Sequence, residues 1–310
     1  MEFNHIPVLL KECIEGLNIK PDGIYVDGTL GGAGHSSQIA KKLSDKGLLI
    51  GIDRDIEAIN TAKNRLSEFK NIKYINDNHD NIKNILDEIN INKVDGILLD
   101  LGVSSYQLDE EKRGFSYKTN TALDMRMDTS QELTAKDVVN NYTEEKLAQI
   151  IYEYGEEKFS RRIARNICEF RKNEVIETTD QLVKIIEKSI PEAAKNHKGH
   201  PAKRTFQAIR IEVNNEIEPL YNTVMASIDS LKSKGRLCII TFHSLEDRAV
   251  KQAYINACGK CTCPSDLPYC VCGKEEKGII VNKKPILPTE EEIEQNSRSK
   301  SAKLRIFEKI

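Results

Sequence analysis

Residues 25–36 of this chain read YVDGTLGGAGHS, and this stretch decides the fold. An apolar run at residues 23–26 ends in Asp27, a glycine-rich turn follows, and residues 38–43 have a helical pattern. Glycine allows the backbone to approach a ligand closely and to reach positive φ. The free N–H groups at a helix start favour negative or electron-rich ligand groups. The stretch therefore predicts a strand, a ligand-binding loop and a helix.

A second apolar run, at residues 47–52, ends in Asp53. An acid that closes the second strand is well placed to accept hydrogen bonds from ribose hydroxyls. The loop glycines do not follow the G-x-G-x-x-G spacing of dinucleotide sites, and Asp27 would repel a pyrophosphate. An acid there suits a cofactor with a cationic amino-acid end, such as S-adenosylmethionine. We therefore favour a methyltransferase, with a dehydrogenase as an alternative.

The composition is typical of a soluble globular protein, since 39% of the 310 residues are hydrophobic and 30% are charged. No apolar run approaches the ~20 residues that span a bilayer, and the N-terminus has no secretory pattern. We expect a cytoplasmic protein with no membrane partner. The net charge of −2 neither supports nor excludes nucleic-acid binding, which would depend on local patches.

Strand and helix patterns alternate up to about residue 110. A short strand at residues 72–75 is followed by polar residues 77–79, and a strand at residues 94–100 ends in Asp100. Because ligands bind beyond the carboxyl ends of the strands in an open α/β sheet, these polar groups should lie on one edge of the sheet with Asp27 and Asp53.

Helical patterns then replace the strands, until strands return at residues 235–241 and 304–307. The predicted fold is α/β, a class I Rossmann-like sheet with an inserted all-helical domain. The expected divisions are a first sheet part at 1–110, a helical insertion at 111–204 and a second sheet part at 205–310. A long helical pattern at residues 206–231 contains Pro219, which should kink or divide it.

Two further segments carry candidate functional groups. In residues 241–248, Ser244 and Asp247 are explained as a helix N-cap and its reciprocal partner, whereas His243 is not explained by capping. His243 should lie where a strand meets the ligand edge of the sheet. The basic run at residues 197–206 is either a phosphate-contacting segment or a solvated connector.

Five of the 8 cysteines lie between Cys258 and Cys272. Clustered cysteines in a cytoplasmic chain suggest a metal before a disulfide. The Cys-x-Cys pairs do not have the usual zinc spacing, so reduced cysteines that shape a loop are the favoured interpretation and a structural zinc is the alternative. We assign no metal-ligating residue to the predicted ligand-binding site.

Several motifs together resemble one family, the bacterial small-subunit (16S) ribosomal RNA (cytosine-N4)-methyltransferases of type H, also called the MraW family. The motifs run nearly from end to end of the chain. They are HIPVLL (5–10), VDGTLGGAGHS (26–36), LDLGVSSYQLD (99–109), RGFS (113–116), LDMRMD (123–128), PAKRTFQAIRI (201–211), FHSLEDR (242–248) and SKSAKLR (299–305).

The resemblance implies a methyltransferase domain interrupted by a helical substrate-recognition domain, with S-adenosylmethionine as cofactor. It implies a cytidine of small-subunit ribosomal RNA as substrate, in the decoding region and within the assembled or nearly assembled subunit. His79 stands where many relatives carry an aromatic residue near the adenine, and histidine can also stack there. The implied cofactor contacts are Ala33, Gly34, His35, Asp53, His79, Asp100 and Gln107.

The exocyclic amino group of cytosine is a poor nucleophile, because its lone pair is delocalised into the ring. Acceptors on the amino protons would localise that pair and align it with the methyl donor. Asp100 is the first candidate for this role and His243 the second, although Asp100 could serve only the cofactor. The Pro-Pro-aromatic sequence of DNA amino-methyltransferases is absent after Asp100.

An unstacked base needs a pocket, for which the candidates are Arg113, Phe115, Asp124 and Arg126, unless these residues are structural. Two functions other than ribosomal RNA methylation stay open at this point. One is a DNA amino-methyltransferase, and the other is a non-catalytic, cofactor-binding ribosome assembly factor.

Overall fold

The computed structural model describes residues 7–104, 107, 110–195, 199–259, 269, 273 and 275–310. The chain forms two compact units, one built from residues 1–102 and 217–310 and the other from residues 103–216. We call them the sheet unit and the helical unit. Among the described residues, no helix is both long and apolar enough to cross a membrane.

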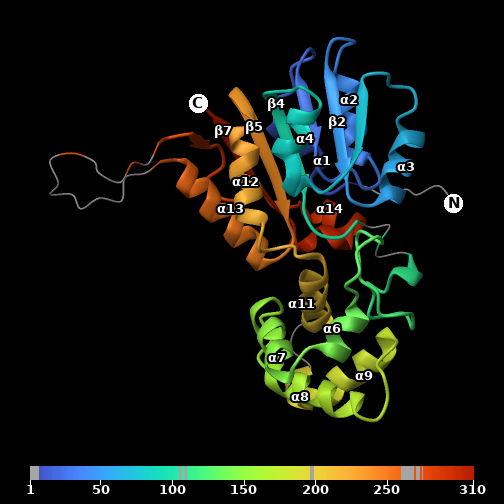
Figure 1. Cartoon of the computed structure of the whole chain (residues 1–310). Coiled ribbons are helices and arrows are strands. Elements are labelled where there is room, and N and C mark those ends of the chain that lie inside the picture. The colour runs from blue at the N-terminus through green and yellow to red at the C-terminus, as the bar shows by residue number, and fades with distance from the viewer. Residues whose placement is uncertain are drawn as a thin grey trace. The chain divides into compact units, whose positions relative to one another are not determined.

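In the part of the chain that the structure describes, the sheet unit contains seven strands in the order β3-β2-β1-β4-β5-β7-β6 (Figure 1). Strands β1 to β5 pair in parallel, and β7 runs antiparallel to β5 and β6. This confirms the predicted Rossmann-like α/β sheet. The strands are β1 (Ile24–Asp27), β2 (Leu48–Asp53), β3 (Ile72–Asn76), β4 (Val94–Asp100), β5 (Leu231–Thr241), β6 (Gly278–Ile280) and β7 (Lys303–Lys309).

Helices cover both faces of this sheet, each with its own apolar core. One core joins α4, α12 and α13 to strands such as β4, whose residues 94–99 are all buried. The core on the other face joins α1 and α2 to Tyr25, Leu49 and Leu98. The helices of this unit are α1 (Leu10–Leu17), α2 (Gly34–Lys42), α3 (Ile56–Arg65), α4 (Ile82–Glu88), α12 (Leu220–Asp229), α13 (Ser244–Ala257) and α14 (Glu290–Gln295).

The helical unit has a separate core of its own. The spacing of Thr178 and Gln181 in the sequence predicts a capping box ahead of a helix, and this box is confirmed at the start of α9. Within this unit, an isolated antiparallel bridge joins Ala122 and Thr178. The helices are α6 (Ala135–Asn141), α7 (Glu144–Glu153), α8 (Ser160–Arg171), α9 (Thr179–Ser189), α10 (Glu192–Lys195) and α11 (Lys203–Asn214).

The long helical pattern around Pro219 is divided, as predicted, into α11 and α12. The helical unit ends at residue 216 rather than at the predicted residue 204, because it includes the whole of α11. The reason is packing, since Phe206, Ile209 and Val213 on α11 are buried in the core of the helical unit. At the other boundary, the helical unit begins at residue 103 rather than 111.

Candidate functional site

The carboxyl ends of β1, β2 and β4 bring three acids to one edge of the sheet, as expected. Asp27 pairs in register with Gly51 of β2 and Leu98 of β4, and Asp53 pairs with Asn76 of β3. The loops beyond the strands are joined by backbone hydrogen bonds, from Gly28 N to Leu98 O (2.9 Å) and from Leu30 N to Ile52 O (3.1 Å). We call this edge, with its loops, the carboxyl edge.

The glycine-rich loop leads into α2 through a left-handed residue, Ala33, whose φ is 58°. A Cβ atom at Gly34 would lie 2.2 Å from Cγ of Pro7, so the close approach of this segment requires glycine. The N-cap residue of α2, Ala33, makes no side-chain capping hydrogen bond. The backbone N–H groups of the first turn therefore remain available to a ligand.

Asp27 closes the first strand but does not present a free carboxylate. Ser36 Oγ donates to its Oδ2 at 2.6 Å, and Thr29 N donates to its Oδ1 at 3.2 Å. Burial raises the pKa of Asp27, while the Ser36 hydroxyl opposes that rise. Asp27 therefore joins the loop to α2 and contributes its charge to the edge from a buried position.

Asp53 at the end of β2 accepts two backbone hydrogen bonds, from Gly31 N (2.8 Å) and from Asp55 N (2.9 Å). Burial raises the pKa of Asp53 to about 6, against the pull of these two N–H groups. Each carboxylate oxygen has a second lone pair. The carboxylate can thus accept ribose hydroxyls without giving up the bonds that orient it.

The environment of Asp100, at the end of β4, differs from that of Asp53. Its backbone N donates to Thr29 Oγ1 at 2.7 Å, which fixes the end of the strand to the glycine loop. Its side chain is 23% exposed, yet Oδ1 is covered and has no hydrogen-bond partner among the described residues. Burial, with the charges of Asp27 and Glu246, raises the pKa of Asp100 to about 8. Asp100 is therefore mostly protonated at neutral pH.

Two histidines near the edge are held in the neutral form. His35 Nε2 lies 3.0 Å from Val8 O, and its Nδ1 lies 3.8 Å from Asp100 Oδ2. Burial lowers the pKa of His35. His79 begins the 3-10 helix η1 (His79–Asn81), its Nε2 lies 3.8 Å from Asp80 Oδ1, and burial lowers its pKa to about 4. A neutral ring suits stacking on an adenine.

His243 has a role that the sequence interpretation missed. It is the N-cap of α13, where Nδ1 accepts from Glu246 N at 3.4 Å and Glu246 Oε2 accepts from His243 N at 3.2 Å. The prediction that Ser244 and Asp247 form this cap was wrong, because the helix begins one residue earlier than expected. Asp247 instead pairs with Arg305 at 2.6 Å and Lys303 at 3.2 Å.

Glu246 is the candidate site residue that sequence reasoning missed most clearly. Its Oε1 lies 3.0 Å from His243 Nε2, its Oε2 also accepts from Phe242 N at 2.7 Å, and its charge raises the pKa of Asp100. β4 and β5 are neighbours, and Leu101 N donates to Ile240 O at 3.0 Å. The strand order is what brings 242–246 beside Asp100. The spacing of three residues between His243 and Glu246 is that of a capping box, which the sequence could have signalled. Histidine, however, is not among the usual N-cap residues.

The remaining predicted residues lie in the helical unit. Gln107 is buried, its Oε1 accepts from Ser104 N at 3.1 Å, and its contact with the cofactor stays a prediction. Arg113 donates to Arg126 O and Met127 O, and Arg126 pairs with Asp124 at 2.8 Å. These bonds give the polar members of the suggested base pocket a structural role.

Two other predictions lie partly or wholly outside the described residues. The cysteine cluster is described only at Cys258, because Cys261, Cys263, Cys270 and Cys272 are outside the described ranges. In the basic run, residues 197 and 198 are outside them as well.

A parallel sheet of this topology, with a glycine-rich loop and three acids at its carboxyl edge, has the architecture of α/β proteins that bind a nucleoside cofactor at that edge. The family model described as the MraW methylase family matches residues 2–310. The chain is 58% identical over 311 residues to the ribosomal RNA small subunit methyltransferase H of Lachnospira eligens, covering all of this chain and 99% of that one. It is also 58% identical to the protein of the same name from Clostridioides difficile, over the whole of both chains. The chain belongs to the MraW methylase family.

Proposed function

We propose that this chain transfers the methyl group of S-adenosylmethionine to the exocyclic N4 amino group of a cytidine in small-subunit ribosomal RNA. The observation that carries the proposal is Asp100, a carboxyl group at the end of β4 with a buried oxygen that has no partner among the described residues. Such an oxygen is costly to keep unless a ligand supplies a donor or a positive charge. The names of the relatives support the substrate class.

The carboxyl edge fits the proposed cofactor. Asp53 would hold the ribose hydroxyls, the uncapped turn at Ala33, Gly34 and His35 would hold the amino-acid end, and His79 would stack on the adenine. Gln107 stays a predicted cofactor contact. S-adenosylmethionine, when bound, supplies a methyl group on a positively charged sulfur.

Asp100 would act on the amino group of the target base. With a pKa of about 8, it is largely protonated in the free protein, and a cation bound beside it would favour the ionised form. An ionised carboxylate accepts hydrogen bonds from the amino protons and holds the nitrogen in line. Orientation of this kind supplies much of the acceleration in such transfers.

His243 would act as a positioning residue rather than as a free base. Nδ1 accepts from Glu246 N, so this nitrogen is not free to take a proton from a substrate. Nε2 is buried 3.0 Å from Glu246 Oε1 and makes no hydrogen bond with any described residue. The His243–Glu246 pair would keep residues 242–246 fixed beside Asp100 and hold a negative charge there.

The helical unit, residues 103–216, would recognise the RNA. We further propose that the substrate is the assembled or nearly assembled small subunit, in the decoding region, and that the protein acts in the cytoplasm.

The test is transfer of labelled methyl to unmodified small subunits, with naked ribosomal RNA and duplex DNA in parallel and mass spectrometry of the nucleosides. The expected product is N4-methylcytidine in subunits, absent from DNA. Asp100→Ala should abolish it, whereas Asp87→Ala, which removes an exposed carboxylate from α4, should not. Label in DNA would replace the proposal with a DNA amino-methyltransferase. Tight cofactor binding without any label would replace it with an assembly factor.

A further inference from the structure

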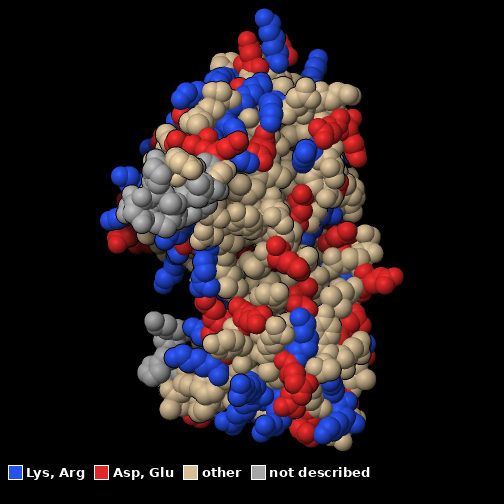
Figure 2. Space-filling model, turned by 60° about the vertical axis from the view of Figure 1, so that its left-hand side comes forward, with Lys and Arg blue, Asp and Glu red and all other residues tan. Residues whose placement is uncertain are grey.

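Helix α8 and the residues before it carry a concentration of positive charge that the proposed methyl transfer does not use. Residues 158–172 contain six Lys and Arg residues and a single acid, Glu169. Figure 2 shows Lys and Arg side chains at several places on the surface of the helical unit, with Asp and Glu side chains among them. The six are Lys158, Arg161, Arg162, Arg165, Arg171 and Lys172.

Two of these six cations have internal partners. Arg171 donates to Val139 O (2.7 Å) and Tyr142 O (2.6 Å), and Lys172 pairs with Glu169 at 2.7 Å. Arg171 therefore has a structural role, and the charge of Lys172 is neutralised by Glu169.

The four cations at the beginning of the segment have a more exposed environment. Lys158, Arg161 and Arg162 are exposed and have no carboxylate partner among the described residues. Arg165 is 70% exposed, with Nε 3.7 Å from Glu144. Cations crowded on one surface repel each other, and a polyanion would relieve that repulsion.

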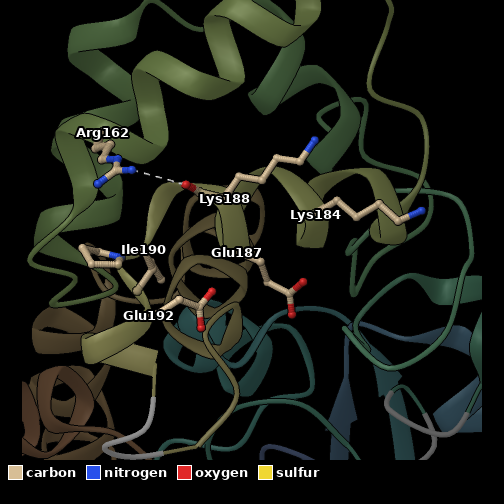
Figure 3. Close-up of a pocket in the computed structure, with 7 residues that line it drawn as sticks. Arg162, Lys184, Glu187, Lys188, Ile190 and Glu192 are labelled. Atoms are coloured by element: carbon tan, nitrogen blue, oxygen red, sulfur yellow. Dashed lines mark hydrogen bonds between the residues drawn. The ribbon is translucent and has the colours of Figure 1, made fainter.

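The end of α9 extends the same surface. Arg162 Nη2 donates to Lys188 O at 3.4 Å, and Asn166 Nδ2 donates to Ser189 Oγ at 2.7 Å. Arg162, Lys184 and Lys188 line an open depression of about 450 Å³ there, which also contains Glu187 and Glu192. Figure 3 shows Lys184 and Lys188 extending away from both carboxylates. Asp180 pairs with Lys184 at 2.6 Å, which leaves Arg162 and Lys188 as the available cations.

A stacked pair of rings borders this depression. Glu187 Oε1, at the depression, lies 3.9 Å from His200 Nε2. The His200 ring stacks on Tyr117 with centroids 4.6 Å apart and an interplanar angle of 22°. The His200 side chain is 33% exposed. Cations beside accessible flat rings are the usual combination in sites for single-stranded nucleic acid.

We propose that the α8–α9 basic surface, defined as Lys158, Arg161, Arg162, Arg165 and Lys188, binds the phosphate backbone of the RNA substrate. Arginine suits this role because its planar guanidinium matches phosphate oxygens with two parallel hydrogen bonds. Phosphate contacts fix the position of a nucleic acid without reading its sequence. The surface would therefore position the RNA, while base selection is left to other residues. This inference rests on the proposed function.

The test uses the full chain with three substitutions together, Arg161→Gln, Arg162→Gln and Arg165→Gln. Affinity for naked small-subunit ribosomal RNA is measured by fluorescence anisotropy over a range of salt. Each phosphate contact contributes roughly 0.7 to 0.9 to the slope of log affinity against log salt, so the slope should decrease by about 2 to 3. The KM for subunits should rise by about tenfold or more, with kcat and cofactor affinity unchanged.

The matched control removes the same charge from the same unit at three cations that already have acid partners. Lys136→Gln, Lys172→Gln and Lys184→Gln together should leave the RNA salt slope nearly unchanged, since these residues pair closely with Glu177, Glu169 and Asp180. Should the triple arginine variant bind cofactor poorly, the single variant Arg161→Gln tests the same point. It should lower the slope by about 1.

The two proposals fail in different ways. If the wild type methylates no RNA, the proposed function fails whatever the salt slope. If the wild type methylates subunits and the triple variant keeps the wild-type salt slope and KM, the surface proposal is overturned. Weaker binding to subunits with unchanged binding to naked RNA would also overturn it, because the partner would then be a ribosomal protein.

Discussion

The ends of β2 and β4 place an aspartate at the same edge of one sheet, yet the two carboxyl groups differ. Asp53 accepts backbone N–H groups from Gly31 and Asp55, and its pKa is about 6. Asp100 has an oxygen without a partner among the described residues, lies near Asp27 and Glu246, and has a pKa of about 8. The same residue type at the same kind of position thus becomes a preformed acceptor in one place and a protonated group in the other.

The difference shows that the strand places the carboxyl group at the edge of the sheet, while the groups around it set its pKa. Donors from the loop oppose the effect of burial at Asp53. At Asp100 no such donor reaches Oδ1, and nearby negative charge adds to the effect of burial. This division fits a cofactor whose ribose meets Asp53 and whose positive charge lies near Asp100.

The largest expected effect comes from Asp100→Asn. The amide keeps the shape but cannot accept two amino protons as a carboxylate does, so kcat for methyl transfer should fall by roughly 10²- to 10⁴-fold. The measurement is single-turnover transfer to small subunits at saturating cofactor. Asp87→Asn on α4 is the control, and a variant rate within twofold of wild type would assign Asp100 to binding alone.

Asp53→Ala should act on cofactor binding instead. Loss of a charge-assisted acceptor costs about 1.5–3 kcal/mol, so the cofactor Kd should rise by roughly 10- to 100-fold. Calorimetry of cofactor binding checks this, and kcat at saturating cofactor should stay close to wild type. A fall in kcat with unchanged Kd would remove the distinction between the two acids.

Cofactor affinity should depend on pH through Asp100. Below pH 8 the free protein holds a proton there, and binding of a cation releases it. The Kd should therefore decrease by up to about tenfold per unit as pH rises towards 8, and then level off. Calorimetry in two buffers of different ionisation enthalpy should detect the released proton, and Asp100→Asn should abolish both effects.

The same linkage applies to folding. The folded-state pKa of Asp100 is raised, so its contribution to stability is complete near pH 4 and is lost as pH rises to 8. The free energy of unfolding of Asp100→Asn should accordingly decline less over this range than that of the wild type. Equal slopes in urea titrations at several pH values would show that Asp100 titrates normally.

The smallest effect is expected at the cap of α13. His243→Ala removes the cap and should lower the free energy of unfolding by about 1 kcal/mol, whereas His243→Asn supplies another capping group and should restore most of it. Methyl transfer by His243→Asn should stay near the wild-type rate if His243 only positions residues 242–246. A stable asparagine variant with a large loss of kcat would return His243 to a direct catalytic role.

Local patterns in the sequence were enough for much of this molecule. The run at 25–36, the acids at Asp53 and Asp100, the capping box at Thr178 and the break near Pro219 all depend on residues within a few positions of each other. Such patterns predicted the strands from β1 to β5, the final strand and the change to a helical unit. The short elements β6 and α14 had too few residues to produce a recognisable pattern.

The sequence by itself determined that a glycine-rich loop and several strand-ending acids belong to one sheet edge, because strand alternation and glycine are local properties. Only the tertiary structure decided how each acid behaves. Pairing of β4 with β5 brings Glu246 near Asp100, the loop gives Asp53 its N–H donors, and α11 joins the helical unit through its buried face. These outcomes depend on contacts between distant segments, and no local pattern encodes burial or the charge of a neighbour across a sheet.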